Sequence, residues 1–423
     1  MVTTPERDFS VSFILPNGFD LGGVTSWSME LAERLAETGQ QTTLVRHIDS
    51  YVSGEYLMPD GVRLVECPHR IHPNHWHLLK SDIDTFHSVY GRLPPSVVIP
   101  NYSYGSYAAC ARLAAEAADI RVLGMAHTDH IEYYQWLVQF ESIIHRFVAV
   151  SREIGEHLAG LLPHREQDIV VRPCGVAVDS RLERHYSEPE RPLKIIYAGR
   201  LSERQKNVSD LVRLAVVLAE QGVDFELRIY GAGRDRSSLE SLVESRSENV
   251  RKKVFFCGQV AAGEMAALYA SSDLLVLVSE YEGTSVSMLE AMAQGCVPVV
   301  NRVSGTAGVI TEGVNGFSVP VGDVGQMVEK IAWLNSDRSR LRELGRAAHK
   351  TVYRHHSYED YVPWFSTLLD ELWQEKLRPW QGGAFHFYFP IRHFITEAGY
   401  VLAAKPGLRW LYRLKGPLKR VIG

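Results

Sequence analysis

The sequence lacks the features that mark membrane-spanning and secreted proteins. None of its apolar runs approaches the roughly 18 residues that a spanning helix needs. The first eight residues are charged and contain no apolar core, so we expect no signal peptide. The five cysteines are scattered and include no Cys-x-x-Cys pair, which favours reduced thiols in a cytoplasmic protein.

The chain also lacks an excess of charge of one sign and the glycine pattern of dinucleotide-binding folds. A net charge of −5 gives no reason to expect nucleic acid as a partner. Without a G-x-G-x-x-G sequence, a two-domain dehydrogenase gains no support. What is present is the composition of an ordinary globular protein, 45% hydrophobic and 22% charged, with 423 residues, enough for two or three domains.

Apolar strand-like runs alternate with helical patterns along most of the chain, which predicts an α/β fold with doubly wound sheets. The expected strands are 9–15, 41–46, 62–66, 96–99, 121–126 and 146–150, then 193–198, 225–230, 254–257, 273–278 and 296–300. The predicted domains are a Rossmann-like acceptor-binding half at 1–178, a linker at 179–192, a Rossmann-like nucleotide-sugar-binding half at 193–376 and an aromatic and basic extension at 377–423. Two such halves predict a cleft between them.

The most informative segment follows the strand expected at 273–278. That strand ends in an acidic, glycine-containing turn, and a helix opens directly from the turn at Thr284 and Ser285. Glu282 and Glu290 lie on either side of this helix start. Ligands of open α/β sheets bind at the carboxyl ends of strands, and helix starts attract phosphate. A carboxylate on each side could hold sugar hydroxyls, so the spacing suggests a nucleotide-sugar site.

Two cations lie near another helix start in the same half. Arg200 follows the strand 193–198 after Gly199, and Lys206 comes six residues later. An arginine fork and a lysine point charge suit a diphosphate. Isolated pairs of this kind are more often solvated surface charges, but the acidic pair in the same half favours the binding site.

Three further strand ends have turns whose backbone could approach a ligand. They are Gly22-Gly23 after the first strand, Gly231-Ala232-Gly233 after 225–230, and Gln259-Val260 after 254–257. Glycine permits a close approach of backbone to phosphate or sugar, although each glycine pair is equally consistent with a plain tight turn. The backbone at Gln259 could read a base edge.

Histidines raise the alternative of a metal site. His127, Asp129 and His130 follow the strand 121–126, but no further ligand has a suitable spacing, so we expect no metal. His127 could instead donate to a sugar hydroxyl or a leaving phosphate, or be a structural histidine. The histidine-rich segment 69–77 is predicted to be a polar loop near the mouth of the cleft.

Together these motifs resemble the family-4 retaining glycosyltransferases, which have the GT-B architecture, over about residues 9–373. The resemblance rests on Gly22-Gly23, the HTD-like turn at His127, Ala149-Val150-Ser151, Cys174-Gly175-Val176 with Asp179, Gly199-Arg200-Leu201 with Lys206-Asn207, Gly231-Ala232-Gly233, Glu282 with Glu290, Asn315-Gly316-Phe317 and Val321-Gly322-Asp323. One departure is Cys174, which stands where the family usually has asparagine.

The resemblance implies a role for each site residue. Arg200 and Lys206 would hold the donor diphosphate, Glu282 the transferred hexose and Glu290 the ribose hydroxyls, while His127 would lie beside the anomeric centre. The remaining donor-binding positions would be Gly23, Gly199, Gly231, Gly233, Gln259, Val260, Gly283, Thr284, Ser285 and Val286. Gly22 and Asp129 would face the acceptor. Similar enzymes retain anomeric configuration, commonly by front-face attack, and generally work without a metal or other cofactor.

The predicted function is transfer of a hexosyl unit from a nucleoside diphosphate sugar, with a UDP-sugar favoured, to a glycan or lipid-linked acceptor in cell-surface polysaccharide or glycolipid biosynthesis. Sugar-nucleotide epimerisation on the same fold and a non-catalytic nucleotide-sugar binding module are the alternatives.

Residues 405–423 contain six cations and no acid. They could bind the anionic inner face of a membrane, or dock on the first domain.

Overall fold

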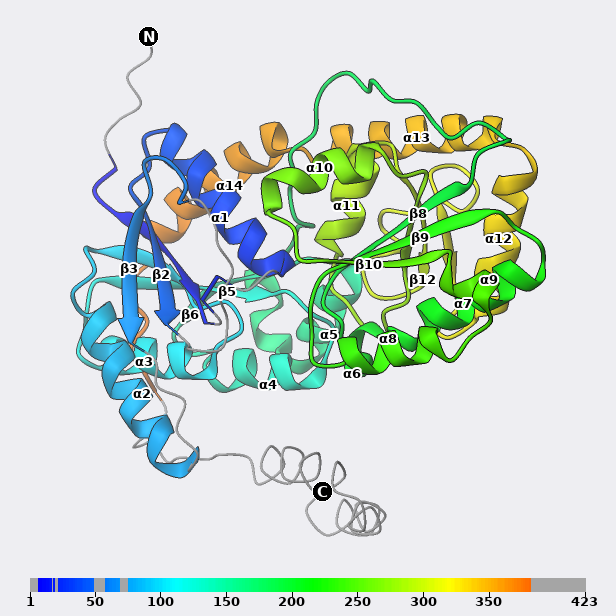
Figure 1. The fold of residues 1–423 in the computed structure, drawn as a ribbon. Helices are drawn as coiled ribbons and strands as arrows, with labels where there is room; N and C mark the ends of the chain where they lie inside the picture. Colours follow the sequence, from blue (N-terminus) through cyan, green and yellow to red (C-terminus); the bar gives the residue numbers. More distant parts are fainter. Residues whose placement is uncertain (1–6, 17, 20–21, 49–57, 69–74, 382–423) are drawn as a thin grey trace. The chain divides into compact units, whose positions relative to one another are not determined.

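A computed structural model describes residues 7–16, 18–19, 22–48, 58–68 and 75–381; of residues 75–81 and 262 only the backbone is described. Residues 7–380 contain two parallel sheets, each covered by helices (Figure 1). The predicted α/β fold with two doubly wound sheets is therefore confirmed. The tail 382–423 and residues 69–74 of the predicted histidine-rich loop lie outside the described residues. The last three residues of that predicted loop, 75–77, form the start of a helix, α2 (His75–Tyr90), so the loop prediction is wrong for them.

The first sheet has seven parallel strands in the order β3-β2-β1-β4-β5-β6-β7. Its strands are β1 (Ser10–Leu15), β2 (Thr42–Ile48), β3 (Arg63–Pro68), β4 (Ser96–Ile99), β5 (Ile120–Ala126), β6 (Ile144–Ala149) and β7 (Ile169–Val171). Its helices are α1 (Gly23–Glu37), α2 (His75–Tyr90), α3 (Tyr104–Ala115), α4 (Ile131–Gln139) and α5 (Arg152–Leu161), with the 3-10 helix Pro163–Asp168. All residues of β1 and β4 are buried, as expected of central parallel strands.

The second sheet has six parallel strands in the order β10-β9-β8-β11-β12-β13. The strands are β8 (Leu193–Ala198), β9 (Phe225–Tyr230), β10 (Val254–Gly258), β11 (Leu274–Leu277), β12 (Val297–Asn301) and β13 (Phe317–Val319). The helices are α6 (Glu203–Lys206), α7 (Ser209–Glu220), α8 (Arg236–Glu244), α9 (Glu248–Arg251), α10 (Ala262–Ala270), α11 (Val286–Ala293), α12 (Val324–Ser336), α13 (Ser339–His355) and α14 (Tyr358–Trp373).

Strand order reverses at one point in each sheet, and these points place the ligand site. The first strand of each half, β1 or β8, lies between its second strand and its fourth, so successive crossovers run to opposite sides of it. The loops that leave the carboxyl ends at a reversal point diverge and form a crevice. Gly22 and Gly23 follow β1, and Arg200 follows β8. Both reversal points therefore contribute residues that the sequence predicted for the site.

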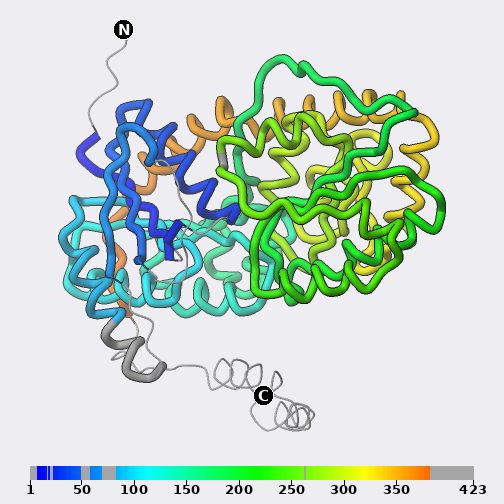
Figure 2. Tube along the Cα trace, viewed as in Figure 1, coloured from blue at the N-terminus to red at the C-terminus, as the bar shows by residue number. Residues whose placement is uncertain are grey.

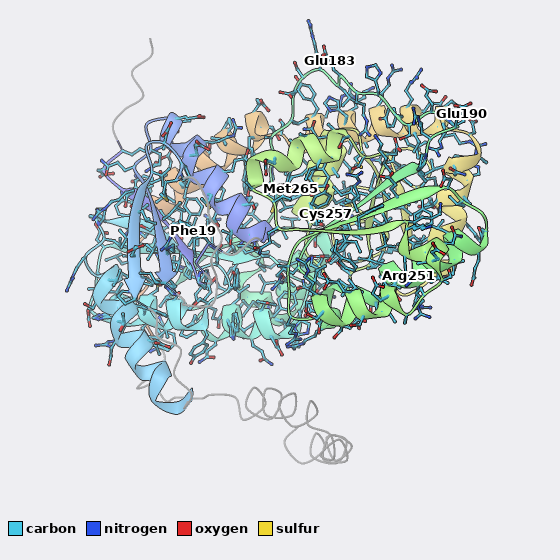
Figure 3. The ribbon with its side chains drawn as sticks, in the orientation of Figure 1. Phe19, Glu183, Glu190, Arg251, Cys257 and Met265 are labelled. Atoms are coloured by element: carbon cyan, nitrogen blue, oxygen red, sulfur yellow. The ribbon has the colours of Figure 1, made fainter. Side chains whose placement is uncertain are left out.

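The predicted linker 179–192 contains no helix or strand and lies on the second sheet's side. Arg184 donates to the carbonyl of Gln294 at 2.7 Å, and the Tyr186 hydroxyl donates to the carbonyl of Gly295 at 2.9 Å. Figure 3 labels Glu183 and Glu190 on this segment. These bonds attach it to the end of α11.

The chain crosses between the two halves a second time at the start of α14. The amide of Val176 donates to the carbonyl of His356 at 2.8 Å, and the amide of Tyr358 donates to the carbonyl of Val176 at 3.2 Å. The helix α14 then packs on α1 and β4, and Trp373 stacks on Phe9 with ring centroids 4.8 Å apart. Figure 2 shows this orange segment beside the blue start of the chain.

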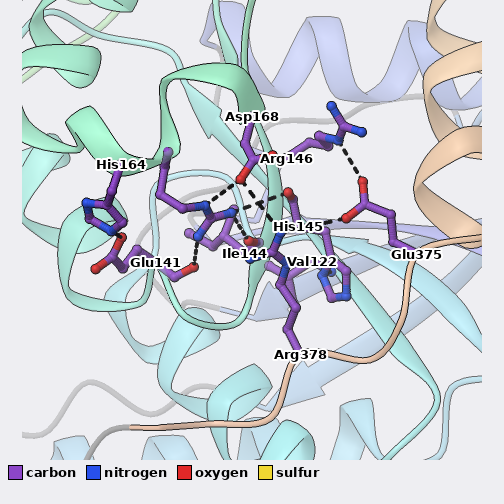
Figure 4. A network of polar contacts seen from close by, with 10 residues as sticks. Val122, Glu141, Ile144, His145, Arg146, His164, Asp168, Glu375 and Arg378 are labelled. Atoms are coloured by element: carbon purple, nitrogen blue, oxygen red, sulfur yellow. Dashed lines mark hydrogen bonds and ion pairs between the residues drawn. The ribbon is translucent and has the colours of Figure 1, made fainter.

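The residues after α14 are attached to the first sheet by a charged network (Figure 4). Glu375 accepts from Nε of Arg146 at 2.6 Å, and Arg378 lies 3.6 Å from the carboxylate of Asp168. Arg165 donates to that same carboxylate and to three backbone carbonyls of the first half. Residues 374–380 therefore continue the packing of α14 on the first domain.

Candidate active site

A cavity with a volume of about 540 Å³ lies where carboxyl ends of strands from both sheets meet. It is lined by all but one of the residues that the sequence predicted for the site: Gly22, Gly23, His127, Gly199, Arg200, Lys206, Gly231, Gly233, Gln259, Val260, Glu282, Gly283, Thr284, Ser285, Val286 and Glu290. Asp129 is the exception. Residues from six separate connections, each of which follows the carboxyl end of a strand, thus meet in one cavity.

The acidic turn after β11 is paired with the cation predicted beside it. Lys206 donates to Oε1 of Glu282, and both side chains are largely buried, with exposed fractions of 14% and 11%. Asn207, which adopts a left-handed φ of 50°, ends the short helix α6 directly after this lysine. The contact compensates two charges that would otherwise be desolvated and unpaired.

The helix α11 begins without a side-chain cap. The N-cap residue Ser285 contacts the hydroxyl of Ser287 at 3.0 Å and makes no capping bond to the first turn of the helix. Free first-turn amides and the positive end of the helix dipole form a site for an anion. Because Glu282 and Lys206 lie in the same cavity, a bound group would meet both signs of charge at this point.

Arg200 is held near the cavity wall by Gln205. Its Nη2 donates to Oε1 of Gln205 at 2.7 Å, and the amide of Gln205 in turn contacts the carbonyl of Tyr281 at 3.3 Å. The carbonyl of Arg200 accepts from the hydroxyl of Tyr197 at 2.9 Å. The backbone turn and the guanidinium are thus both fixed, and the turn that carries Arg200 is tied to the acidic turn.

The glycines of the second half are required by packing between turns. A Cβ on Gly231, whose φ is 131°, would lie 2.0 Å from the carbonyl oxygen of Gly199, and one on Gly233 would lie 2.1 Å from that of Leu201. A Cβ on Gly283 would lie 2.1 Å from the carbonyl oxygen of His127. These contacts explain the glycines without a ligand, in agreement with the plain-turn alternative that the sequence left open.

His127 lies at the end of β5 and is bonded through one ring nitrogen. Its Nε2 is 2.9 Å from Oδ1 of Asn101, and its ring meets Trp27 edge-on at 5.1 Å. The ring borders the cavity on one side and protein on the others, so desolvation lowers its pKa to about 3. His127 is therefore neutral at physiological pH. Neither Asn101 nor Trp27 was singled out from the sequence, although Asn101 also follows a strand end.

The structure does not bring the Asp129 carboxylate into the cavity. Its Oδ1 accepts from the Tyr134 hydroxyl at 2.8 Å and lies 2.8 Å from Nδ1 of His157. Its backbone amide donates to the carbonyl of Glu282 at 3.0 Å, so the residue joins the two halves.

Within the described part of the chain, no three His, Cys, Asp or Glu side chains group in a way that could hold a metal ion.

Glu290 lies in the second turn of α11, and its carboxyl group is close to the carboxyl group of Glu30. Burial, and then the charge of Glu30 on α1, raise its pKa to about 8. The hydroxyl of Tyr269 lies 3.5 Å from its Oε2. Burial also raises the pKa of Glu30, against the effect of Arg34 beside it. Glu290 is thus largely protonated at neutral pH when the cavity is empty.

Cys174, at the position where the resemblance implies asparagine, lines the cavity and is buried. Burial raises the pKa of its thiol to about 12, so it is an uncharged, weakly polar group. All five cysteines are free, and Cys257 is the exposed one (Figure 3).

The described helices include none with the length and apolar character to span a bilayer.

Aromatic side chains that the sequence did not indicate lie on the first-domain side of the cavity. Tyr102, after β4, and Tyr133, on α4, both line it, and their rings meet edge-on with centroids 6.4 Å apart. Tyr133 also contacts Trp136 at 5.3 Å. Beside them, Glu132 accepts from Arg204 at 3.0 Å across the two halves. The signal that could have found Tyr102 is its position three residues after the end of a short apolar strand.

Two facing Rossmann-like sheets with a cavity between their carboxyl ends define the GT-B class of glycosyltransferase folds. Comparison with known families agrees: residues 21–180 match the family described as Glycosyltransferase Family 4, and residues 179–351 match Glycosyl transferases group 1. The chain belongs to these family-4 glycosyltransferases, as the motifs predicted.

Individual relatives are distant. N-acetyl-alpha-D-glucosaminyl L-malate synthase of Bacillus anthracis is 29% identical over 45% of this chain and 48% of its own length. Phosphatidyl-myo-inositol mannosyltransferase of Mycolicibacterium smegmatis is 24% identical over 82% of this chain and 89% of its own. The solved Anabaena HepE in complex with UDP and glucose superposes with a TM-score of 0.68 at 14% identity, over 86% of this chain and 100% of HepE. The matches to the first three curated relatives span less than half of their lengths.

Proposed function

We propose that this chain transfers a hexosyl unit, with retention of anomeric configuration, from a UDP-sugar to a glycan or lipid-linked acceptor in cell-surface polysaccharide or glycolipid biosynthesis. The observation that carries the proposal is the Lys206–Glu282 pair at the uncapped start of α11, in the same cavity as Arg200. A sugar diphosphate needs an anion site directly beside a carboxylate that accepts sugar hydroxyls. Those two requirements meet here.

The roles follow from charge. When the donor binds, its diphosphate forms ion pairs with the Lys206 ammonium and the Arg200 guanidinium. Lys206 then no longer pairs with Glu282, and the Glu282 carboxylate can accept hydrogen bonds from the hexose hydroxyls. Negative charge grows on the diphosphate as the glycosidic bond breaks, so fixed cations and helix amides stabilise the transition state more than the ground state. Glu290, further along α11, accepts from the ribose hydroxyls.

A solved structure of similar fold, two tyrosines in the cavity and one relative support the choice of donor and acceptor. HepE was solved with UDP and glucose, which makes UDP-glucose the first donor to test. Tyr102 and Tyr133 offer flat apolar ring faces with polar hydroxyls at the cavity, the surface against which a sugar ring packs. One relative is a phosphatidyl-myo-inositol mannosyltransferase, which supports a lipid-linked glycan as the acceptor class.

We further propose that no metal takes part. Two cationic side chains and the α11 amides supply the positive charge that a diphosphate requires, so activity should be unchanged in excess EDTA. The site of action that we propose is the cytoplasmic face of a membrane, with the protein peripherally bound through the cations of 405–423, which lie outside the described residues.

The test begins with the donor. A thermal-shift panel of UDP-, GDP-, ADP- and TDP-sugars should raise the melting temperature most for a UDP-sugar, because a ligand that binds the native state stabilises it. Proton NMR of the products should then show acceptor-dependent transfer with retained anomeric configuration.

Three outcomes would contradict the proposal. An epimer formed from the UDP-sugar alone would identify an epimerase. Tight binding with neither hydrolysis nor transfer, on any acceptor glycan tested, would identify a binding module. An inverted product would refute retention while leaving the donor site intact.

A further inference from the structure

The His127 ring is held by a residue outside every motif. Asn101 follows β4 and is 1% exposed. Its Oδ1 lies 2.9 Å from Nε2 of His127, and its Nδ2 donates to the carbonyl of Ile14 at 2.7 Å and to the hydroxyl of Ser28 at 3.3 Å. One amide therefore joins the ends of β1 and β4, the helix α1 and the turn after β5.

These contacts determine which end of the amide faces the ring. A backbone carbonyl can only accept, so the hydrogens of Nδ2 must point to Ile14. Oδ1 then faces His127 and, because it can only accept, Nε2 must carry the ring proton. The neutral ring is left with its lone pair on Nδ1.

Nδ1 is the nitrogen that remains for a ligand. Among the described residues it has no hydrogen-bond partner, and His127 lines the cavity together with Arg200 and Glu282. The edge-on contact with Trp27 keeps the ring from turning freely. Burial holds the ring neutral, so the lone pair is not lost to a second proton.

We propose that Asn101 is a positioning residue that makes His127 a hydrogen-bond acceptor toward a hydroxyl of the bound donor sugar. The inference rests on the proposed function. Donation from His127 to a sugar hydroxyl or to the leaving phosphate, which the sequence suggested, requires a ring N–H that Asn101 already occupies. A lone pair repels phosphate oxygen, so the diphosphate is left to Arg200 and Lys206, and the hydroxyl is held in one orientation.

The backbone conformation of Asn101 determines which substitutions at this position can test the proposal. Its φ of 52° is left-handed, a conformation that glycine, asparagine and aspartate adopt most readily. Asn101→Gly removes the amide and suits the backbone. Asn101→Asp keeps an acceptor for Nε2 and loses the donor to Ile14. Ser28→Ala removes a different partner of the same amide and serves as the matched control.

The first measurement needs no substrate. Long-range proton–nitrogen NMR of the full-length, ¹⁵N-histidine-labelled protein at neutral pH reports which ring nitrogen is protonated, with His127 assigned by its loss in His127→Gln. We expect a solvent-protected Nε2–H in the wild type, in Ser28→Ala and in Asn101→Asp, and loss of that protection in Asn101→Gly. A proton on Nδ1 in the wild type, or an unchanged protected signal in Asn101→Gly, would overturn the assignment.

Transfer kinetics separate this inference from the proposed function. For the donor selected by thermal shift, Asn101→Gly should lower kcat about 100-fold, the typical effect of a misplaced group, while the donor KM stays within about twofold. Asn101→Asp should recover most of the loss. If the NMR result holds but no donor is turned over, the proposed function fails and the ring geometry stands. If Asn101→Gly loses the protected proton but keeps wild-type kcat, the positioning role is wrong.

Discussion

At the scale of single residues, the site contains a buried ion pair, and the proposed function requires this pair to open when the donor binds. Lys206 and Glu282 are each less than one-sixth exposed. Removing one partner of such a pair leaves the other charge desolvated, which costs about 3–5 kcal/mol when burial is complete. The same sensitivity makes the pair responsive to a ligand that brings its own anion and hydroxyls.

Glu282→Gln tests the carboxylate. The amide keeps the shape but cannot accept strongly from sugar hydroxyls in the transition state, so kcat should fall by about 100- to 1,000-fold. Steady-state kinetics measure it, and Glu280→Gln, an exposed carboxylate two residues earlier, is the control. Equal activity of the two variants would remove Glu282 from the site.

Glu290 gives a pH dependence of stability. An unfolded glutamate loses its proton near 4.5, but the buried Glu290 carboxyl keeps its proton up to about 8. The folded state therefore binds more protons in this window, and its contribution to stability declines as the pH rises from about 4.5 to about 8. Glu290→Gln should flatten the dependence of Tm on pH across that window, measured by thermal melts.

Glu30→Gln is the companion variant to Glu290→Gln. It removes the like charge that helps to raise the pKa of Glu290, so it should move the upper end of the window to lower pH. If neither variant changes the wild-type pH profile, the two carboxyls do not share a desolvated environment.

Half of the residues that line the cavity were predicted from the sequence, because of one physical rule. Residues directly after buried parallel strands meet at one edge of a sheet, and every predicted site residue but Asp129 lines the cavity. Asp129 also follows a buried strand, but its carboxylate contacts Tyr134 and His157 and does not line the cavity. Asn101 and Tyr133 were missed because their importance comes from contacts with other elements, which spacing along the chain does not reveal.

At the scale of elements, the strands were predictable where they are central and the short edge elements were not. The limits expected for β8 and β9 match the structure. The edge strand β7 has only three residues, Ile-Val-Val, none of them buried, and an apolar run this short does not signal a strand. The helix α4 is rich in aromatic residues, which are weak helix formers, and its N-cap is His130 rather than a serine or aspartate.

The contact between the turns after β5 and β11 can be tested by adding one methyl group. In Gly283→Ala the new Cβ would lie 2.1 Å from the carbonyl oxygen of His127, a backbone atom that has to move. We expect a loss of about 1–3 kcal/mol in the free energy of unfolding and a large loss of activity, because the turn also carries Glu282. Denaturant unfolding and initial rates measure the two effects.

Gly263→Ala is the matched control for Gly283→Ala. It adds the same group to α10, where nothing lies within 4 Å of the new Cβ, and should be neutral or stabilise by up to about 1 kcal/mol. A Gly283→Ala protein as stable and active as this control would show that the two turns are not in the close contact described.

At the scale of the whole molecule, the sequence could not show which sheet is covered by α14, the last helix among the described residues. The helix α14 follows the second half along the chain and was assigned to it, but it packs on α1 and β4 of the first. An amphipathic pattern shows that one face is buried and does not show against what. Val176, bonded to both His356 and Tyr358, holds the two crossings together.

The membrane proposal is tested with the intact chain. Lys405, Arg409, Arg413, Lys415, Lys419 and Arg420 are the six cations of the tail. Each basic residue near an anionic surface contributes about 1 kcal/mol of binding, screened by salt. The full-length protein should therefore sediment with phosphatidylglycerol vesicles, but not with phosphatidylcholine vesicles, and high salt should release it.

The six cations replaced together by glutamine, and a chain that lacks 405–423, should both remain in the supernatant. They should keep wild-type turnover of a soluble acceptor, because the cavity is formed by residues before 291. Equal and negligible sedimentation of all three proteins would contradict membrane binding and favour docking of the tail on the first domain. Loss of turnover in the truncated chain alone would place the apolar residues of the tail, rather than its charges, in that docking contact.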